Sequence, residues 1–138
     1  MKKKFIYICL LIILLVIALI YLFSKKFEGD FIIIEKQTDK VGTYEYYDEI
    51  NEPDSVKSVK NILNKSHWSS GKVDMPYPPD YQFYFMNNDE DKSKHENVYL
   101  WISPDRNKVA LIFDSKYIQL NEKKSNKLFE ILTGKKLE

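Results

Sequence analysis

The sequence predicts an α+β domain with a mostly antiparallel sheet, in the order β-β-α-β-β-β-β-α with the helices on one face, preceded by one transmembrane helix. Three observations lead to this fold. Residues 5–23 carry no charge, several later segments are short and rich in β-branched and aromatic residues, and two segments place apolar residues at helical spacing. We therefore expect a membrane anchor over residues 1–26 and one extracytoplasmic domain over residues 27–138.

The N-terminal segment has the length and composition of a membrane span. Residues 5–23 form a run of 19 uncharged residues. As an α-helix this run covers about 28 Å, close to the hydrocarbon thickness of a bilayer. Only a continuous helix satisfies every backbone hydrogen bond in that environment. We expect these residues to contact the lipid bilayer.

The flanking charges predict the orientation of this helix. Lys2, Lys3 and Lys4 precede the apolar run, whereas the lysines that follow it are soon joined by acids. The positive-inside rule then places the N-terminus in the cytoplasm and the domain outside the plasma membrane. A cleaved signal peptide is the alternative, but its apolar region is shorter and ends in small residues, which Ile20–Phe23 does not offer.

Two strands and a helix open the domain. Phe31–Ile34 and Thr43–Asp48 are short segments of strand-forming residues, separated by a turn. Asn51–Asp54 then supplies a capping side chain, acids and a proline, which together favour a helix start. A helix is expected over residues 53–65, with one apolar stripe formed by Val56, Val59, Ile62 and Leu63. Trp68 and Val73 fit a short extended piece.

Four strands and a second helix complete the domain. The strands are expected at Tyr81–Met86, Val98–Ile102, Val109–Phe113 and Tyr117–Leu120, and their turn-rich connections suit an antiparallel meander. The last helix has Asn121 as its expected cap and Gly134 as its stop, with Leu128, Ile131 and Leu132 on one face.

The composition supports a folded domain and argues against a nucleic-acid-binding surface. Of the 138 residues, 44% are hydrophobic and 14% aromatic, which is too apolar for a disordered chain. The net charge is +1, but Lys2, Lys3, Lys4, Lys25 and Lys26 contribute five positive charges, so residues 27–138 carry −4. We therefore expect no nucleic acid among the partners.

The search for catalytic, cofactor-binding and metal-binding residues predicts none of these sites. His67 and His95 have no helical partner at metal-ligand spacing. Asn87–Asp91 is rich in oxygen ligands, but a calcium loop in that register would need a glycine at Lys92 and a glutamate at Val98. A neighbourhood of His67, Asp74 and Asp80 is the remaining alternative for an enzyme, although it contains no evident nucleophile and base pair.

One face of the central strands carries a possible interaction surface. If Phe83 and Leu100 face the helices, the alternation along each strand sends Tyr84, Tyr99 and Trp101 to the opposite face. That face would offer an aromatic platform to a partner. In the alternative interpretation, loops such as Pro76–Asp80 cover it, or the two faces are reversed.

Short motifs in the domain resemble the YhfM-like domain family, small extracytoplasmic domains of bacillus-type bacteria. They are Val73-Asp74-Met75, Pro79-Asp80-Tyr81, Tyr99-Leu100-Trp101-Ile102-Ser103 and Tyr117-Ile118-Gln119-Leu120, and the resemblance covers most of residues 30–133. It implies no catalytic residue. Members often look like lipoproteins, whereas this chain has the features of an uncleaved helix.

These observations favour a non-enzymatic, single-pass cell-envelope protein of a Gram-positive bacterium. The lysine-rich composition with a single arginine, Arg106, suits such a source. Its small domain would bind or interact with a partner outside the membrane, and an envelope protein is the expected kind of partner. The alternative is an immunity or inhibitor protein that acts against a secreted toxin or enzyme. No cofactor is expected.

Overall fold

The computed structural model describes residues 1–24, 27–89, 91 and 95–138. Along the chain lie α1 (Lys2–Ser24), β1 (Phe31–Gln37), β2 (Tyr44–Ile50), α2 (Pro53–Lys65), β3 (Ser69–Ser70), β4 (Tyr81–Met86), β5 (Val98–Ile102), β6 (Val109–Phe113), β7 (Lys116–Gln119) and α3 (Glu122–Thr133). The α+β class is confirmed. The structure adds the short strand β3. β1 extends beyond its expected end to Gln37 beside the Thr38–Thr43 turn, and β2 extends to Ile50, because the two strands pair over this whole length.

The strands form one antiparallel sheet in the order β2-β1-β4-β5-β6-β7-β3. β4, β5, β6 and β7 follow each other as the expected meander. β1 pairs with β4 even though α2 and β3 lie between them in the sequence. This long-range pairing determines the strand order, which the sequence alone does not specify.

The pairing register gives the sheet two distinct ends. At one end lie Phe31, Met86, Val98, Phe113 and Lys116, because β1, β5 and β7 begin there and β4 and β6 end there. We call this the proximal end, since the chain enters the domain there from α1. At the opposite, distal end lie the Thr38–Thr43 turn and the Ser103–Lys108 turn.

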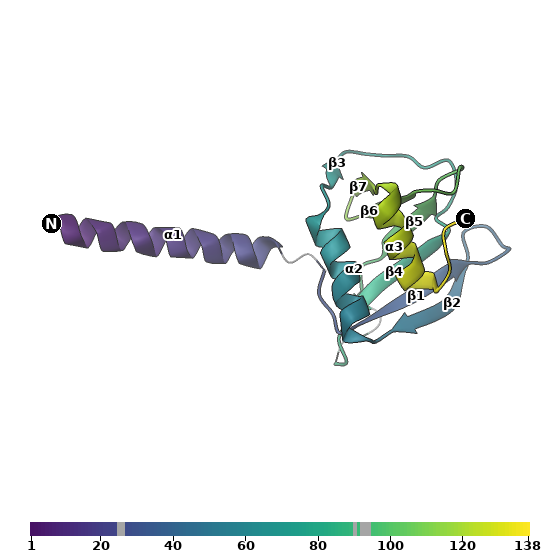
Figure 1. Cartoon of the computed structure of the whole chain (residues 1–138), viewed down its shortest axis with the longest axis horizontal. Coiled ribbons are helices and arrows are strands. Elements are labelled where there is room, and N and C mark those ends of the chain that lie inside the picture. The colour runs from purple at the N-terminus through teal and green to yellow at the C-terminus, as the bar shows by residue number, and fades with distance from the viewer. Residues whose placement is uncertain (25–26, 90, 92–94) are drawn as a thin grey trace.

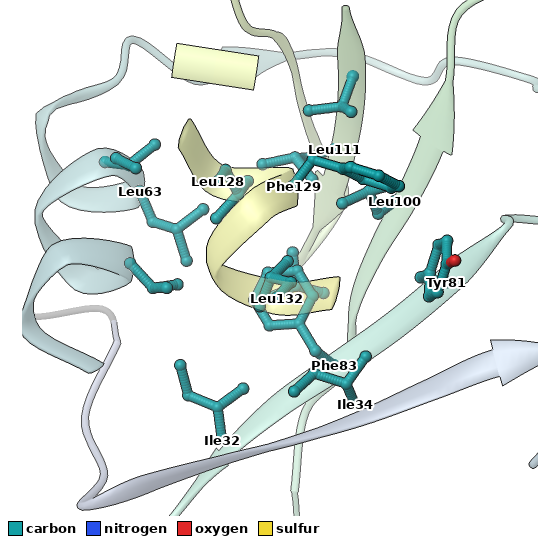
Figure 2. Packing of buried hydrophobic residues seen from close by; sticks show 14 of the residues in the cluster. Ile32, Ile34, Leu63, Tyr81, Phe83, Leu100, Leu111, Leu128, Phe129 and Leu132 are labelled. Carbon is teal, nitrogen blue, oxygen red and sulfur yellow. The ribbon is translucent and has the colours of Figure 1, made fainter. Parts of the chain in front are cut away.

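Both helices of the domain pack on the same face of the sheet (Figure 1). Figure 2 shows Ile32, Ile34 and Phe83 from the strands together with Leu63 of α2 and Leu132 of α3. All five side chains are buried in one cluster, which also takes in Leu100 and Leu111 from the neighbouring strands. The helix-facing side of the sheet is therefore the hydrophobic core, as the alternation in β4 and β5 predicts.

The helix boundaries agree with the sequence signals, with one exception. Asn121 accepts a hydrogen bond from the backbone N–H of Lys124 at 2.9 Å, and Gly134 ends α3 in the left-handed conformation with φ of 68°. At the start of α2, however, the N-cap is Glu52 and its side chain makes no capping bond. Its carboxylate instead accepts from the Ser55 hydroxyl at 2.9 Å, so this helix start is favoured by Pro53 and by the acidic Asp54 in the first turn.

The N-terminal helix α1 stands apart from the domain core. Its large apolar side chains between Phe5 and Tyr21, such as Leu11 and Leu14, are exposed. Within the described residues it is one helix that is long and apolar enough to cross a membrane. An exposed apolar helix at this position is typical of a membrane anchor or a signal sequence. Lys25 and Lys26, the lysines of the predicted C-terminal flank, lie outside the described residues.

Candidate functional site

The sheet face opposite the helices carries all three residues of the predicted interaction surface. Phe83 and Leu100 belong to the buried core, so their neighbours Tyr84, Tyr99 and Trp101 point to the other side of the sheet. We call this side the outer face. The structure places these three residues in different surroundings.

Trp101 is buried beneath the segment that links β3 to β4. Its ring is 6% exposed, and its Nε1–H donates to the backbone oxygen of Tyr77 at 2.8 Å. The small side chain of Ala110 on β6 lies opposite Trp101 and is itself buried. The expected alternative, in which the Pro76–Asp80 segment covers the outer face, is therefore what the structure shows at Trp101.

Two further hydrogen bonds hold this covering segment against the sheet. The Asp80 carboxylate accepts from the backbone N–H of Ile102 at 2.7 Å, and the Tyr44 hydroxyl donates to the backbone oxygen of Pro79 at 2.7 Å. Both bonds lie toward the distal end, where β4 begins. The segment is thus fixed by the Tyr44 side chain of β2 and by the backbone at the end of β5.

Tyr84 is buried in a second, smaller cluster on the outer face. It packs with Ile33, Met86 and Phe31, and its ring stacks on His95 with centroids 3.6 Å apart. Burial, with a smaller contribution from the nearby Glu35 carboxylate, raises the pKa of the Tyr84 phenol above its usual value. Tyr84 is therefore a packing residue, and its hydroxyl stays neutral at physiological pH.

Tyr99 remains half-buried and forms the floor of a groove at the proximal end. The register aligns Tyr99 on β5 with Ile112 on β6 and Tyr117 on β7, so the three side chains form a row across the outer face. Gly71–Asp74 forms one wall, and Asp114, Ser115 and Lys116 close the proximal side. The groove has a volume of about 730 Å³ and opens to solvent.

The lining combines an apolar floor with charges of both signs at the rim. Lys72 and Lys116 supply ammonium groups, Asp74 and Asp114 supply carboxylates, and the floor supplies aromatic rings with hydroxyl groups. Sites that bind organic ligands have this combination of apolar surface and a few polar groups. Because both charge signs are present, the groove suits a ligand that also carries both, such as a peptide segment.

A strained turn shapes the proximal wall of the groove. Asp114 and Ser115 link β6 to β7 in a two-residue hairpin, and both have positive φ, 47° and 59°. Such turns usually contain asparagine or aspartate followed by glycine, so Asp114 suits its position and Ser115 stands where glycine is favoured. Strained residues of this kind often lie at binding sites. Here both members of the turn line the groove.

The residues of the alternative enzyme neighbourhood do not form a common site. Asp74 lies in the groove, Asp80 is bonded to the backbone of Ile102, and His67 is exposed after α2. Among residues 1–24, 27–89, 91 and 95–138, no three His, Cys, Asp or Glu side chains form a group that could hold a metal ion. The Asn87–Asp91 loop is described only in part, because residue 90 lies outside the described residues. Residues 92–94, which include Lys92, lie outside them as well.

Sequence reasoning named two lining residues of the groove and missed the others: Tyr99 for the interaction surface and Asp74 for the alternative enzyme neighbourhood. Ile112 and Tyr117 follow from the alternation in β6 and β7 once the register is known. Lys72 belongs to a segment without periodicity, so no sequence signal places it over β6 and β7. The groove depends on how that segment crosses the sheet.

Comparisons with known proteins relate the chain to one protein family. One solved structure, a thioesterase-like protein from Clostridium sporogenes ATCC 15579, superimposes with a TM-score of 0.48 and 16% identity, over 74% of this chain and 92% of the other. Similarity at this level carries no inference about activity. No curated protein matches. The family described as YhfM protein matches residues 25–138, and the chain therefore belongs to the YhfM family.

Proposed function

We propose that this protein is a single-pass plasma-membrane protein whose extracytoplasmic domain binds a partner in the Tyr99 groove without catalysing a reaction. The observation that carries this proposal is the groove itself. It is an open hollow on the outer face, and its volume lies within the usual range for binding sites.

The anchor part of the proposal is supported by α1 and by the charges that flank it. The helix is apolar, exposed and long enough to cross a bilayer. The excess of lysines before the apolar run favours a cytoplasmic N-terminus and an external domain. Protease added to intact protoplasts should then digest the domain, and a fully protected domain would contradict this orientation.

The binding part is supported by the chemistry of the groove lining. An extended segment of an envelope protein could lay apolar side chains on Tyr99 and Ile112 while its charged groups pair with Lys72, Asp74, Asp114 or Lys116. The two buried aromatic residues, Tyr84 and Trp101, would not contact the ligand and would instead support the outer face by packing beneath the loops. We therefore assign the contact role to Tyr99 and its neighbours on β6 and β7.

Photo-crosslinking in intact membranes tests this assignment. A benzophenone amino acid placed at Tyr117 lies in the groove, and the same group at Tyr46, which is 63% exposed on β2, serves as the matched control. We expect a discrete adduct from position 117, none from position 46, and loss of the adduct when Tyr99→Ala is added.

The variants must also remain folded for this result to be informative. Tyr99→Ala should keep the circular dichroism spectrum of the parent protein, because Tyr99 lies outside the buried core. Equal adducts from both positions, or an adduct that Tyr99→Ala leaves unchanged in a folded protein, would contradict the groove as the binding site.

A further inference from the structure

The first residue described after α1, Phe27, is a core residue of the domain. Its side chain is 4% exposed. Its ring lies 4.7 Å from that of Phe113, 5.8 Å from that of Phe85 and 6.0 Å from that of Trp68, measured between centroids. Phe27 is therefore packed at the proximal end of the sheet, between β4, β6 and the residues that follow α2.

Gly29 and Asp30, which follow closely after Phe27, are also fixed to the domain. The backbone N–H of Asp30 donates to the Met86 oxygen at 2.7 Å, and the Lys60 ammonium donates to the Gly29 oxygen at 2.5 Å. Gly29 has φ of +154°, and a Cβ there would lie 2.7 Å from the backbone nitrogen of Met86. At Gly29 the chain passes too close to β4 for any other residue. Together these contacts show that the packed domain begins at Phe27.

Covalent geometry then limits how far the domain can stand from the bilayer. α1 ends at Ser24, and three peptide steps separate Ser24 from Phe27. Each step advances the Cα position by at most about 3.8 Å, which gives a maximum of about 11 Å. The polar headgroup layer on each side of a bilayer is itself roughly 5–7 Å thick. A spanning α1 therefore leaves Phe27 within a few ångströms of the headgroups.

We propose that the proximal end of the domain rests on the headgroup layer of the bilayer that holds α1. This inference rests on the anchor part of the proposed function. The surface concerned includes the exposed residues Ser70, Lys72 and Asp114, which lie where β3 ends and where β6 turns into β7. The Tyr99 groove opens beside them. A ligand in the groove would then be bound at the level of the lipid headgroups. A longer tether would not fix the groove at that level.

Fluorescence quenching by headgroup-labelled lipid tests the orientation. The chain has one cysteine, Cys9, so Cys9→Ser allows a single fluorophore to be attached at a chosen position. Ser70→Cys marks the proximal end, and Val41→Cys, at a site that is 75% exposed in the β1–β2 turn, marks the distal end. The two ends are separated by roughly 20 Å, the length of a six-residue strand.

The full chain is reconstituted in vesicles of phosphatidylethanolamine and phosphatidylglycerol that carry a spin label on some headgroups. We expect quenching at position 70 to exceed quenching at position 41 several-fold. A twelve-residue glycine–serine insertion directly after Ser24 should abolish most of this difference. Equal quenching at the two positions, or a difference that survives the insertion, would overturn the proposal.

Two further measurements separate this inference from the proposed function. If the protein does not float with the vesicles, the anchor proposal fails and takes this inference with it. If it floats but shows no difference in quenching, only the inference fails. Phe27→Ala should lower the thermal midpoint of the domain by about 10 °C or more, whereas the insertion after Ser24 should leave it unchanged. An unchanged midpoint for Phe27→Ala would mean that Phe27 is not fixed in the core. The limit on the distance between the domain and the bilayer would then no longer hold.

Discussion

Tyr99 and Trp101 lie two residues apart on the same strand and the same face of the sheet, yet one lines an open groove and the other is buried. The difference comes from the segment that links β3 to β4. Near the distal end it is held by Asp80 and by the Tyr77 oxygen, and it covers Trp101. Near the proximal end, Gly71–Asp74 stays exposed and forms a wall above Tyr99. Side-chain alternation chooses the face, whereas loop packing decides which part of that face can meet a partner.

The largest expected effect separates the two aromatic residues directly. Trp101→Ala should lower the free energy of unfolding by about 3–5 kcal/mol, because it leaves a cavity and removes the bond to the Tyr77 oxygen. Tyr99→Ala should cost about 1 kcal/mol, since its ring is half-buried. Chemical denaturation of the full chain in detergent measures both values. Similar losses for the two variants would mean that the covering segment does not distinguish them.

The second effect concerns the attachment of the covering segment. Asp80→Ala should cost about 1.5–3 kcal/mol, because the partly buried N–H of Ile102 loses a charged acceptor. Asp74→Ala, in the exposed part of the same segment, should change the stability by at most about 0.5 kcal/mol. Hydrogen exchange at the Ile102 amide provides the site-specific measurement. Unchanged protection in Asp80→Ala would show that other contacts fix the segment.

A smaller effect of opposite sign is expected at the wall of the groove. Ser115→Gly should stabilise the protein by about 1 kcal/mol, because glycine adopts the φ of 59° without the strain of a side chain. Ser115→Ala has the same backbone strain as serine and should give no such gain. Thermal unfolding compares the two variants, and a gain in both would assign the effect to loss of the hydroxyl group instead.

The smallest effect is a pH dependence that arises on the covered part of the outer face. Burial raises the pKa of Tyr84, so its neutral form is favoured in the folded state. The contribution of the neutral Tyr84 phenol to the free energy of unfolding is fully present below the ordinary phenol pKa of about 10. It is lost as the pH rises through the raised pKa. Tyr84→Phe should therefore flatten the decline of stability above pH 10 in denaturation curves. An equally steep decline in that variant would assign the alkaline loss to other groups.

Much of the fold could be predicted from local sequence patterns. The alternation in Tyr81–Met86 and Val98–Ile102 places Phe83 and Leu100 in the core, as the structure confirms. Pro53, Asn121 and Gly134 mark helix ends through backbone restrictions and a capping bond. These features depend on interactions between residues that are close in sequence, which is why the sequence reveals them.

The candidate site could be predicted only in part. Strand alternation predicts that Tyr84, Tyr99 and Trp101 all lie on the interaction surface. The structure leaves Tyr99 accessible but buries Tyr84 and Trp101. The packing of Phe27 against Trp68 and Phe113 has no signal in the sequence. Each difference arises from a contact between segments that are far apart in the sequence.

By itself the sequence determined the apolar N-terminal helix, the α+β class, the core-facing side of each central strand and most helix ends, because all of these follow from periodicity and local backbone chemistry. The tertiary structure decided the place of β1 beside β4, the cover over Trp101, the groove at Tyr99 and the docking of Phe27. Those features depend on which distant segments meet, and only the packing of the whole domain selects among the alternatives that local patterns allow.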